Sequence, residues 1–378
     1  MSVKNILFID SYYNSLYGAQ KSMINLALQL KEKNINVTIA SMHSGFLLEE
    51  AKNNNINTYS FNFNPNILKS EHQYSGLYQK ITFIFLLFFS WIRVLILHFH
   101  KLKTSDVICV NDIRTFLYLF PLLMLTRKKN IWYIRIREEK RKLTFLFSFI
   151  TKIIIFISSD VKKNTKIRNN VLVYVLMTGF PRFNLCYKKR KDNNNEIRFV
   201  TVGSLNQRKN QVETIDLFKK IKHSTRSKCT LDIIGSYEPK DFCYYKELNS
   251  IISNDPELNS SVFIHGYCEN ILNLIEDYDV FLFSSLREGL PRSIIEALHA
   301  GLFVITRPVD GVNDILLYDY LGTTYTNLKN IPFEFCDIAD KWLTPEFRLK
   351  RNQYINEKFN NEVFVDNFLS VLNNIEIK

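Results

Sequence analysis

Short apolar runs alternate with longer amphipathic stretches along the first half of this 378-residue chain. The run Ile6–Ile9 is entirely apolar and indicates a buried strand, and Met23–Leu30 follows with the period of a helix. Further strands are expected at 36–41, 58–63, 107–111, 131–136 and 153–158. Because strands that alternate with helices form parallel sheets, the pattern predicts an α/β fold with helices on both faces of a sheet.

The pattern breaks at 187–196, where YKKRKDNNNE has no apolar period and is dense in charge and asparagine. We interpret this segment as an interdomain linker. Five further apolar strands are expected at 197–203, 230–235, 262–266, 280–284 and 303–306. The prediction is therefore two Rossmann-like domains, 1–186 and 197–345, facing across a cleft, with a helical C-terminal segment at 346–378.

One segment, ITFIFLLFFSWIRVLILHF at 81–99, is long and apolar enough to be considered as a membrane span. Arg93 lies inside it, and a charge in that place costs about 2.5–3.5 kcal/mol on insertion scales. A buried core helix and a helix lying in the membrane interface are the other two readings, and both are favoured over a span. The neighbouring basic residues could contact lipid headgroups: Lys101, Lys103, Arg137, Lys140, Arg141 and Lys142.

Composition narrows the class of protein. Hydrophobic residues make up 46% and charged residues 23%, which is typical of a globular protein, and the net charge of +12 favours anionic partners. The six cysteines form no CxxC pair and have no histidine at zinc-ligand spacing, so neither a metal site nor a disulfide framework is indicated. The N-terminus lacks a signal-peptide pattern, and a cytoplasmic location is expected.

The richest stretch in candidate chemistry is FLFSSLREGLPRSIIEALHAG, residues 281–301. A strand leads into a small-residue loop and then into a helix that is expected to begin near Pro291. Glu296 then lies on the helix and Glu288 on the loop before it, so both can face one ligand. Backbone N–H groups at the start of this helix make the loop a favourable place for phosphate.

The segment EGLPRSIIEALHAG resembles the E-x7-E signature of the retaining glycosyltransferases of family 4, also called glycosyl transferases group 1. VGSLNQRKNQVETIDLF, with a lysine six positions after its glycine, is similar to an upstream segment of that family. FIHGYCENILNLIEDYDVFLFSS and VITRPVDGVNDIL resemble the segments that precede and follow the signature, and the likeness covers most of 197–316.

The resemblance implies the GT-B fold and a role for each matched residue. Glu296 would bind the ribose hydroxyls, Glu288 the transferred sugar, and Lys209 the departing diphosphate, which gains charge in the transition state. The family commonly has Arg where this chain has Ser204, and either Arg208 replaces that cation or it is a solvated surface residue. The remaining expected donor-binding residues are Gly203, Ser204, Gly235, Gly289 and Leu290.

In the first half, the loop Ser11–Gln20 resembles a glycine-containing loop that approaches donor phosphate and acceptor in the family. Tyr17, Gly18 and Ala19 are its candidate residues, and a plain connecting turn is the alternative. Other polar residues follow expected strand ends, where ligands of α/β proteins usually bind: Asn111, Asp112, Arg135, Arg137 and Glu138. The resemblance also implies that the C-terminal segment packs back across the domains.

Three features resemble functional sites but are interpreted as structural. Asp277-Tyr278-Asp279 spells a D-x-D metal motif of another glycosyltransferase fold, yet it directly precedes a buried strand. His265 ends a strand and His299 lies on the expected helix, so each is interpreted as a structural histidine. No metal and no cofactor is expected beyond the nucleoside diphosphate sugar that serves as co-substrate.

The functional hypothesis is sugar transfer from a nucleotide-sugar donor to a saccharide or lipid-linked saccharide acceptor, in bacterial polysaccharide biosynthesis such as capsule or lipopolysaccharide assembly. Peripheral contact with the anionic inner face of the membrane is included. An epimerase or phosphorylase on the same frame is one alternative. An inactive partner that binds nucleotide sugar or scaffolds a glycan-assembly complex is another, and Ser204 favours it. Nucleic-acid binding is suggested by charge alone, without a recognisable motif, and is not expected.

Overall fold

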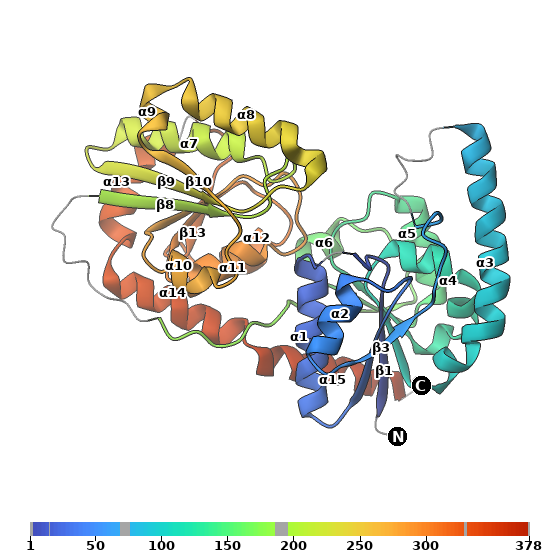
Figure 1. The fold of residues 1–378 in the computed structure, drawn as a ribbon. Coiled ribbons are helices and arrows are strands. Elements are labelled where there is room, and N and C mark those ends of the chain that lie inside the picture. The colour runs from blue at the N-terminus through green and yellow to red at the C-terminus, as the bar shows by residue number, and fades with distance from the viewer. Residues whose placement is uncertain (1–2, 15, 69–75, 186–195, 329–330, 377–378) are drawn as a thin grey trace. The chain divides into compact units, whose positions relative to one another are not determined.

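The computed structural model describes residues 3–14, 16–68, 76–185, 196–328 and 331–376. The chain divides into two compact units, Met1–Gly179 with Asn361–Lys378, and Phe180–Asn360. Each unit is built around one parallel sheet covered by helices (Figure 1), which confirms the expected α/β class with two Rossmann-like domains. The expected linker at 187–196 lies, except for Glu196, outside the described residues.

The first unit contains a seven-stranded sheet in the order β3-β2-β1-β4-β5-β6-β7. Its strands are β1 (Asn5–Asp10), β2 (Asn36–Ser41), β3 (Asn57–Ser60), β4 (Val107–Val110), β5 (Asn130–Ile134), β6 (Ile153–Phe156) and β7 (Leu172–Val175). The central strands are buried on both faces, which explains why they appear in the sequence as unbroken apolar runs. β7 was not expected, because its side chains are only half-buried and it lies at the sheet edge.

Helices from distant parts of the chain cover this sheet: α1 (Gly18–Glu32), α2 (Phe46–Asn53), α3 (Leu77–Thr104), α4 (Ile113–Leu125), α5 (Arg141–Phe147), α6 (Ser159–Lys163) and α15 (Asn361–Glu376), with short 3-10 turns η2 (Arg127–Lys129) and η3 (Ser148–Ile150). The last helix, α15, packs against α1 in the same unit. It buries Phe364, Phe368 and Leu372 there. Helix α15 therefore completes the core of the N-terminal unit, whereas the start of the C-terminal segment, up to Asn360, belongs to the second unit.

The segment at 81–99 forms the central part of α3, and its interpretation as a buried core helix is wrong. Ile84, Phe88 and Ile96 have 66%, 55% and 75% of their surface exposed. Within the described residues, Tyr78–Thr104 is the one helix long and apolar enough to cross a membrane by length and composition. Its most apolar 18-residue window has a mean hydropathy of 2.1, and only 17% of that window is buried.

The second unit contains a six-stranded parallel sheet in the order β10-β9-β8-β11-β12-β13. Its strands are β8 (Glu196–Val202), β9 (Lys228–Ile234), β10 (Val262–His265), β11 (Val280–Phe283), β12 (Phe303–Thr306) and β13 (Gly322–Thr324). The helices are α7 (Gln211–Ser224), α8 (Phe242–Ser253), α9 (Pro256–Asn259), α10 (Ile271–Ile275), α11 (Arg292–His299), α12 (Val312–Ile315), α13 (Ile331–Trp342) and α14 (Pro345–Lys358), with η4 (Pro239–Asp241). The edge strand β13 is short and rich in glycine and threonine, so its sequence did not predict it.

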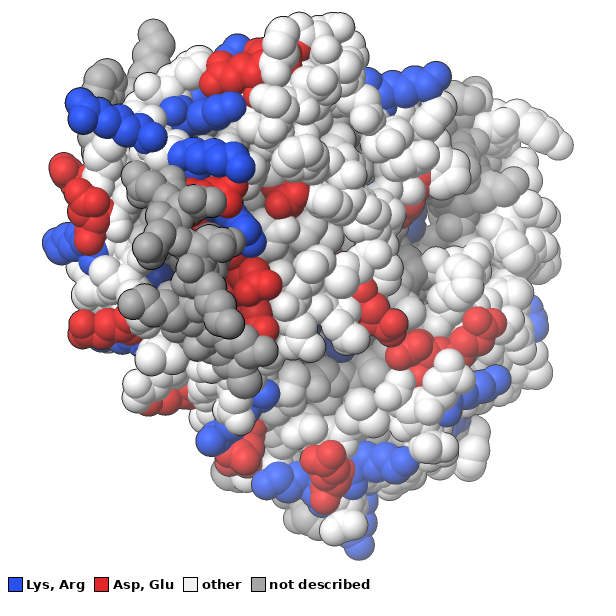
Figure 2. Space-filling model, turned by 60° about the vertical axis from the view of Figure 1, so that its left-hand side comes forward, with Lys and Arg blue, Asp and Glu red and all other residues white. Residues whose placement is uncertain are grey.

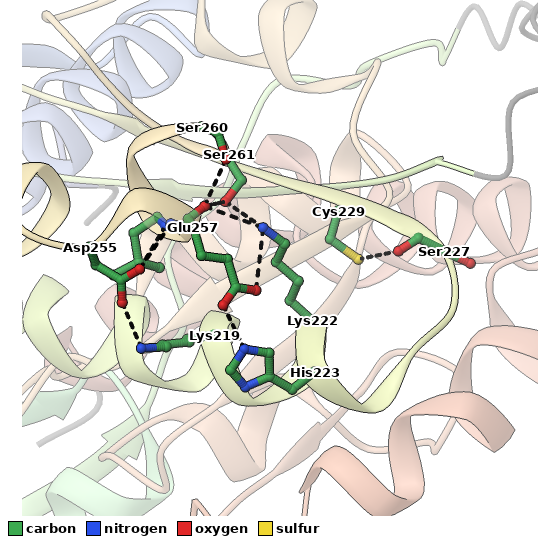
Figure 3. A network of polar contacts seen from close by, with 10 residues as sticks. Lys219, Lys222, His223, Ser227, Cys229, Asp255, Glu257, Ser260 and Ser261 are labelled. Carbon is green, nitrogen blue, oxygen red and sulfur yellow. Dashed lines mark hydrogen bonds and ion pairs between the residues drawn. The ribbon is translucent and has the colours of Figure 1, made fainter.

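A polar network ties α7 to α9 in this unit (Figure 3). Asp255 accepts hydrogen bonds from the backbone at the start of α9 and from Lys219 Nζ, which lies 2.6 Å away. Glu257 bonds His223 on one side and Lys222 on the other. These contacts hold the helix that follows the β8 loop in a defined place over the sheet.

Candidate donor site in the second unit

The parallel strands β8 and β11 lie side by side at the centre of the second sheet, and the strands that follow them in sequence lie on opposite sides of this pair. From β8 the chain proceeds to β9 on one side, and from β11 to β12 on the other. The loops that follow these two strands therefore diverge at the carboxyl edge of the sheet. In doubly wound α/β proteins this switch point is the usual place for a ligand.

The loop after β8 directs a lysine toward the switch point. Gly203 has φ of 152°, a conformation that glycine adopts without strain. The backbone N–H of Lys209 donates to both the backbone and the side-chain oxygen of Asn206, each at 3.0 Å. Asn210, with φ of 54°, then turns the chain into α7. This compact turn fixes the backbone position from which the Lys209 side chain extends.

Three donors converge on one carboxylate oxygen, Oε1 of Glu288. Lys209 Nζ lies 2.8 Å from it and Arg208 Nη1 lies 3.0 Å from it. Ser285 Oγ donates at 2.7 Å. The two loops are also joined by their backbones, since the N–H of Leu286 donates to the carbonyl of Arg208 at 2.8 Å. The structure therefore brings together Arg208, Lys209 and Glu288, which the sequence suggested from separate segments.

The electrostatics of this cluster keep Glu288 ionised. Burial alone would raise the pKa of its carboxyl, but the positive charges of Lys209 and Arg208 and the hydrogen bonds of Lys209 and Ser285 together lower that pKa below its usual value. Lys209 Nζ also lies 5.1 Å from the ring centroid of Phe283 on β11. The result is a carboxylate with two fixed cations at the carboxyl edge of the sheet, able to bind hydroxyl groups and anionic oxygen.

Glu296 lies on α11, which begins at Arg292 with Pro291 as its N-cap residue, as the sequence predicted. Its carboxylate pairs with Arg292 one turn earlier, at 3.7 Å. Leu290 is buried, and the carbonyl of Gly289 approaches Gly311 so closely that a Cβ there would meet it at 2.5 Å. The loop between the two glutamates is therefore packed firmly into the unit.

Two other small residues of the expected donor set, Gly235 and Ser204, lie just after β9 and β8. A Cβ on Gly235 would lie 2.0 Å from the carbonyl oxygen of Gly203, so the ends of β8 and β9 can approach only with glycine at this position. The backbone carbonyl of Ser204 accepts a hydrogen bond from Gln211 Nε2 at 3.0 Å. Position 204 is therefore tied to the first residue of α7.

In the first unit, the expected glycine loop is shorter than predicted. Helix α1 begins at Gly18, so Gly18 and Ala19 lie in its first turn, and the predicted loop Ser11–Gln20 ends at Tyr17. Gly18 is not among the glycines with positive φ. Tyr17 has 47% of its surface exposed at the start of the helix. The interpretation as a phosphate- or acceptor-binding loop stays a prediction.

Two buried aspartates meet where β1 and β4 end in the first unit. Asp112 accepts bonds from the backbone and side chain of Ser11 at 2.8 and 2.7 Å and caps α4. Asp10 accepts bonds from Tyr12 N and Gln20 Nε2. Burial, and then the charge of Asp112, raise the pKa of Asp10 to about 7. The sequence interpretation named Asp112 but missed Asp10, which could have been found as the first polar residue after an apolar strand.

The other rim candidates of the first unit lie near this pair or beyond β5. Asn111 donates to Met23 Sδ and, at 3.5 Å, to Asp10. Arg135 lies over the ring of Tyr133 at 3.4 Å and donates to Ser22 Oγ. Arg137 and Glu138 lie in the loop after β5. The group is therefore divided. Asn111 lies at the β1–β4 junction, Arg135 contacts α1, and Arg137 and Glu138 lie in the loop after β5.

Asp279, His265 and His299, interpreted from the sequence as structural, each have a hydrogen-bond partner within the second unit. Asp279 accepts the backbone N–H of Arg198 at 2.9 Å. His265 pairs with Asp232 at 2.5 Å, and His299 bonds Asn356 on α14 at 2.8 Å. Within the part of the chain that the structure describes, no group of three or more His, Cys, Asp or Glu residues could hold a metal ion.

Ser285 is the residue of this cluster that the sequence interpretation missed. Its hydroxyl also lies 3.3 Å from the carbonyl of Arg208, so it links both loops as well as the carboxylate. A small hydroxyl residue between a buried strand and a glutamate was the available signal. Its role depends on where the β8 loop lies, which the local sequence does not show.

Known proteins resemble this chain in sequence. Residues 187–326 match the family model of glycosyl transferases group 1, so the second unit contains such a domain. The capsular polysaccharide biosynthesis glycosyltransferase CapH of Staphylococcus aureus is 26% identical over 227 residues, which span 58% of this chain and 60% of CapH.

Solved structures extend the likeness to both units. HepE of Anabaena, in a crystal structure with UDP, has a TM-score of 0.76 over 98% of this chain and all of its own, at 16% identity. A glycosyltransferase of Rickettsia africae has a TM-score of 0.77 over the whole of both chains, also at 16% identity. These matches confirm the GT-B fold that the sequence resemblance implied.

Proposed function

We propose that this chain is a retaining glycosyltransferase that moves a sugar from a nucleoside diphosphate sugar to a saccharide or lipid-linked saccharide, in bacterial cell-surface polysaccharide biosynthesis. The observation that carries the proposal is the Glu288 carboxylate held by Lys209 and Arg208 at the switch point of the second sheet. The group 1 domain at 187–326 and the likeness to a UDP-bound structure support a nucleotide-sugar donor.

In the proposed reaction, the bond between the anomeric carbon and the diphosphate oxygen breaks, and its electron pair leaves with the nucleoside diphosphate. A hydroxyl oxygen of the acceptor forms the new bond on the same face, and its proton passes to the departing diphosphate oxygen. Lys209 and Arg208 stabilise the departing diphosphate, because its negative charge grows in the transition state. Glu288 accepts hydrogen bonds from the transferred sugar, and Glu296 from the ribose. The two cations supply the positive charge, so no metal ion is required.

Arg208 takes the place of the arginine that the resemblance expected at position 204. Its guanidinium contacts the same carboxylate oxygen as Lys209 does, and half of its side chain is exposed toward solvent. This contact gives the Glu288 carboxylate a second positive charge beside that of Lys209. The proposal therefore assigns Arg208 as the second diphosphate cation.

The test is a binding and turnover screen against UDP-, GDP-, ADP- and dTDP-sugars. Lys209→Ala and Arg208→Ala should each lower turnover by about 10²-fold or more while the fold is retained. Lys228→Ala, which removes an exposed lysine at the start of β9, is the matched control. Ser204→Arg in the Arg208→Ala background should restore part of the rate. NMR of the first-formed anomer tests retention, and turnover in EDTA tests metal independence.

The main alternative is an inactive partner that binds nucleotide sugar. Donor binding without hydrolysis or transfer would support it, and the absence of binding to any donor would favour a partner that only scaffolds a glycan-assembly complex. Nucleic-acid binding has less support, because it needs a continuous basic surface. On the face drawn in Figure 2, Lys and Arg side chains alternate with Asp and Glu side chains. Peripheral contact with an anionic membrane, in the cytoplasm, is part of the proposed function, and the first unit contains a surface suited to it.

A further inference from the structure

The outer face of α3 is an unusual surface for a protein in water. Figure 1 shows α3 as a long helix along one side of its unit. We define the α3 outer face by seven large apolar side chains that are each between 42% and 75% exposed: Ile81, Ile84, Phe85, Phe88, Phe89, Ile92 and Ile96. They recur at three- and four-residue spacing and so form one continuous stripe. Contiguous exposed apolar stripes of this kind mark interaction sites.

The opposite face of α3 is well packed, so the helix is anchored in its unit. Val94 and Leu102 are buried, and Trp91 Nε1 donates to the carbonyl of Leu117 on α4 at 3.0 Å. Arg93 Nη1 donates to the carbonyl of Asn62 at 2.9 Å. The one charge in the middle of the helix is therefore directed toward the protein rather than across the apolar stripe.

The charge of the surrounding chain has one sign. Residues 77–105 contain no Asp or Glu but carry Lys80, Arg93, Lys101 and Lys103. Residues 113–130, which form the neighbouring α4 and η2, likewise contain no acid and include four basic residues. Lys80, Lys103 and Arg127 are exposed near the ends of α3 and in η2. Basic residues beside an exposed apolar stripe complement a surface with apolar chains below anionic headgroups.

The topology excludes a helix that crosses the membrane. α3 connects β3 to β4, and both strands run parallel in the same sheet. A single span between them would place parts of one sheet on opposite sides of the bilayer, where their backbone hydrogen bonds could not form. The helix can contact a bilayer only along its length.

We propose that the α3 outer face docks on a bilayer containing anionic phospholipids, with the helix lying in the plane of the interface and Lys80, Lys103 and Arg127 contacting headgroups. The apolar side chains then lie among the upper acyl segments, and the packed inner face keeps the first sheet outside the membrane. This inference rests on the membrane contact included in the proposed function and names the surface that makes it. It does not depend on sugar transfer, because the surface belongs to the first unit.

The experiment is co-sedimentation of the full chain with vesicles of phosphatidylcholine alone and of roughly three parts phosphatidylcholine to one part phosphatidylglycerol. The wild type should bind the anionic vesicles, and less so at high salt. Ile84→Ser/Phe88→Ser/Ile92→Ser should weaken binding by about tenfold or more. Phe263→Ser/Leu349→Ser, which removes exposed apolar residues of the second unit, is the matched control and should bind as the wild type does.

A second variant tests the role of charge without touching the apolar stripe. Lys103→Glu/Arg127→Glu should lower binding to anionic vesicles while leaving the circular dichroism and the thermal midpoint unchanged. Equal binding of wild type and triple variant would overturn the proposal. So would a wild-type dimer in size-exclusion chromatography that the triple variant abolishes while neither protein binds vesicles, since the stripe would then cover a second copy. Donor hydrolysis, measured without vesicles, reports separately on the proposed reaction.

Discussion

Glu288 is held by hydrogen-bond donors from two different loops. Lys209 and Arg208 come from the loop after β8, whereas Ser285 comes from the loop after β11. Removal of the carboxylate would leave two adjacent cations without a counter-charge. The same residue therefore contributes to both the stability of the empty site and the binding of a donor.

We expect Glu288→Gln to destabilise the second unit by about 2 kcal/mol at neutral pH, because charged hydrogen bonds of this kind contribute about 1.5–3 kcal/mol. Since the folded pKa of Glu288 is lowered, its contribution is present above the unfolded pKa near 4.5 and is lost as pH falls through the folded value. Denaturant unfolding of both proteins at several pH values should show the difference shrink in acid. A constant difference at all pH values would contradict this assignment.

Asp10 should show the opposite dependence on pH. Its pKa is raised from 3.8 to about 7, so the folded state keeps a proton that the unfolded chain loses, and stability falls as pH rises through this window. In Asp10→Asn this dependence should disappear. The gap between the two proteins should change by about 2–3 kcal/mol, in favour of the variant, between about pH 5 and pH 7.5.

The asparagine amide can be accommodated at position 10, because Gln20 Oε1 and Asn111 Oδ1 are buried and accept no hydrogen bond within the described residues. Chemical denaturation curves at the two pH values give the measurement. A pH-independent offset between Asp10→Asn and the wild type would show that Asp10 is already ionised in the folded state.

At the scale of elements, the donor site depends on how closely two strand ends approach. Gly203 and Gly235 directly follow β8 and β9, and a Cβ on Gly235 would collide with the carbonyl oxygen of Gly203. Because glycine has no side chain, neither residue takes part in the carboxylate cluster through a side-chain contact. They act by allowing the β8 loop to turn toward β11.

Gly235→Ala should therefore destabilise the second unit by about 1–3 kcal/mol and weaken donor binding, since its Cβ would lie 2.0 Å from the Gly203 carbonyl oxygen and the β8 loop must shift. Gly266→Ala is the matched control, because a Cβ at Gly266 meets no heavy atom within 4 Å in the described structure. Denaturant unfolding and donor titration measure the two effects. Equal stability of the two variants would count against the close approach as the cause.

At the scale of the whole molecule, the two ends of the chain share one core. Phe368 on α15 stacks against Phe8 on β1, with ring centroids 6.1 Å apart, and is fully buried. The N-terminal unit therefore cannot complete its core until the last helix has been synthesised. Along the sequence, the second unit is inserted between the two segments that form the first unit.

We expect Phe368→Ala to cost about 3–5 kcal/mol and to lower the unfolding transition of the first unit. The transition of the second unit should move much less, because α15 belongs to the other core. Val363→Ala, on the exposed side of the same helix, is the control. Differential scanning calorimetry of the three proteins resolves the two transitions, and an equal shift of both would indicate that the units unfold as one.

The sequence by itself determined which segments become buried strands, because a strand covered on both faces is an unbroken apolar run, as in β1, β4 and β11. It also located Glu288 on a loop and Glu296 on a helix, since Pro291 marks the helix start. The edge strands β7 and β13 carried no such signal, because half-exposed strands tolerate polar residues and glycine.

Only the tertiary structure decided which polar residues meet and which apolar residues stay exposed. Arg208, Lys209 and Ser285 share one carboxylate oxygen because β8 and β11 are neighbours in the sheet, although nearly eighty residues separate their loops. The length and apolar composition of 81–99 predicted an apolar helix. Whether its outer stripe is covered depends on which other elements pack beside the helix. Local sequence does not show which elements those are.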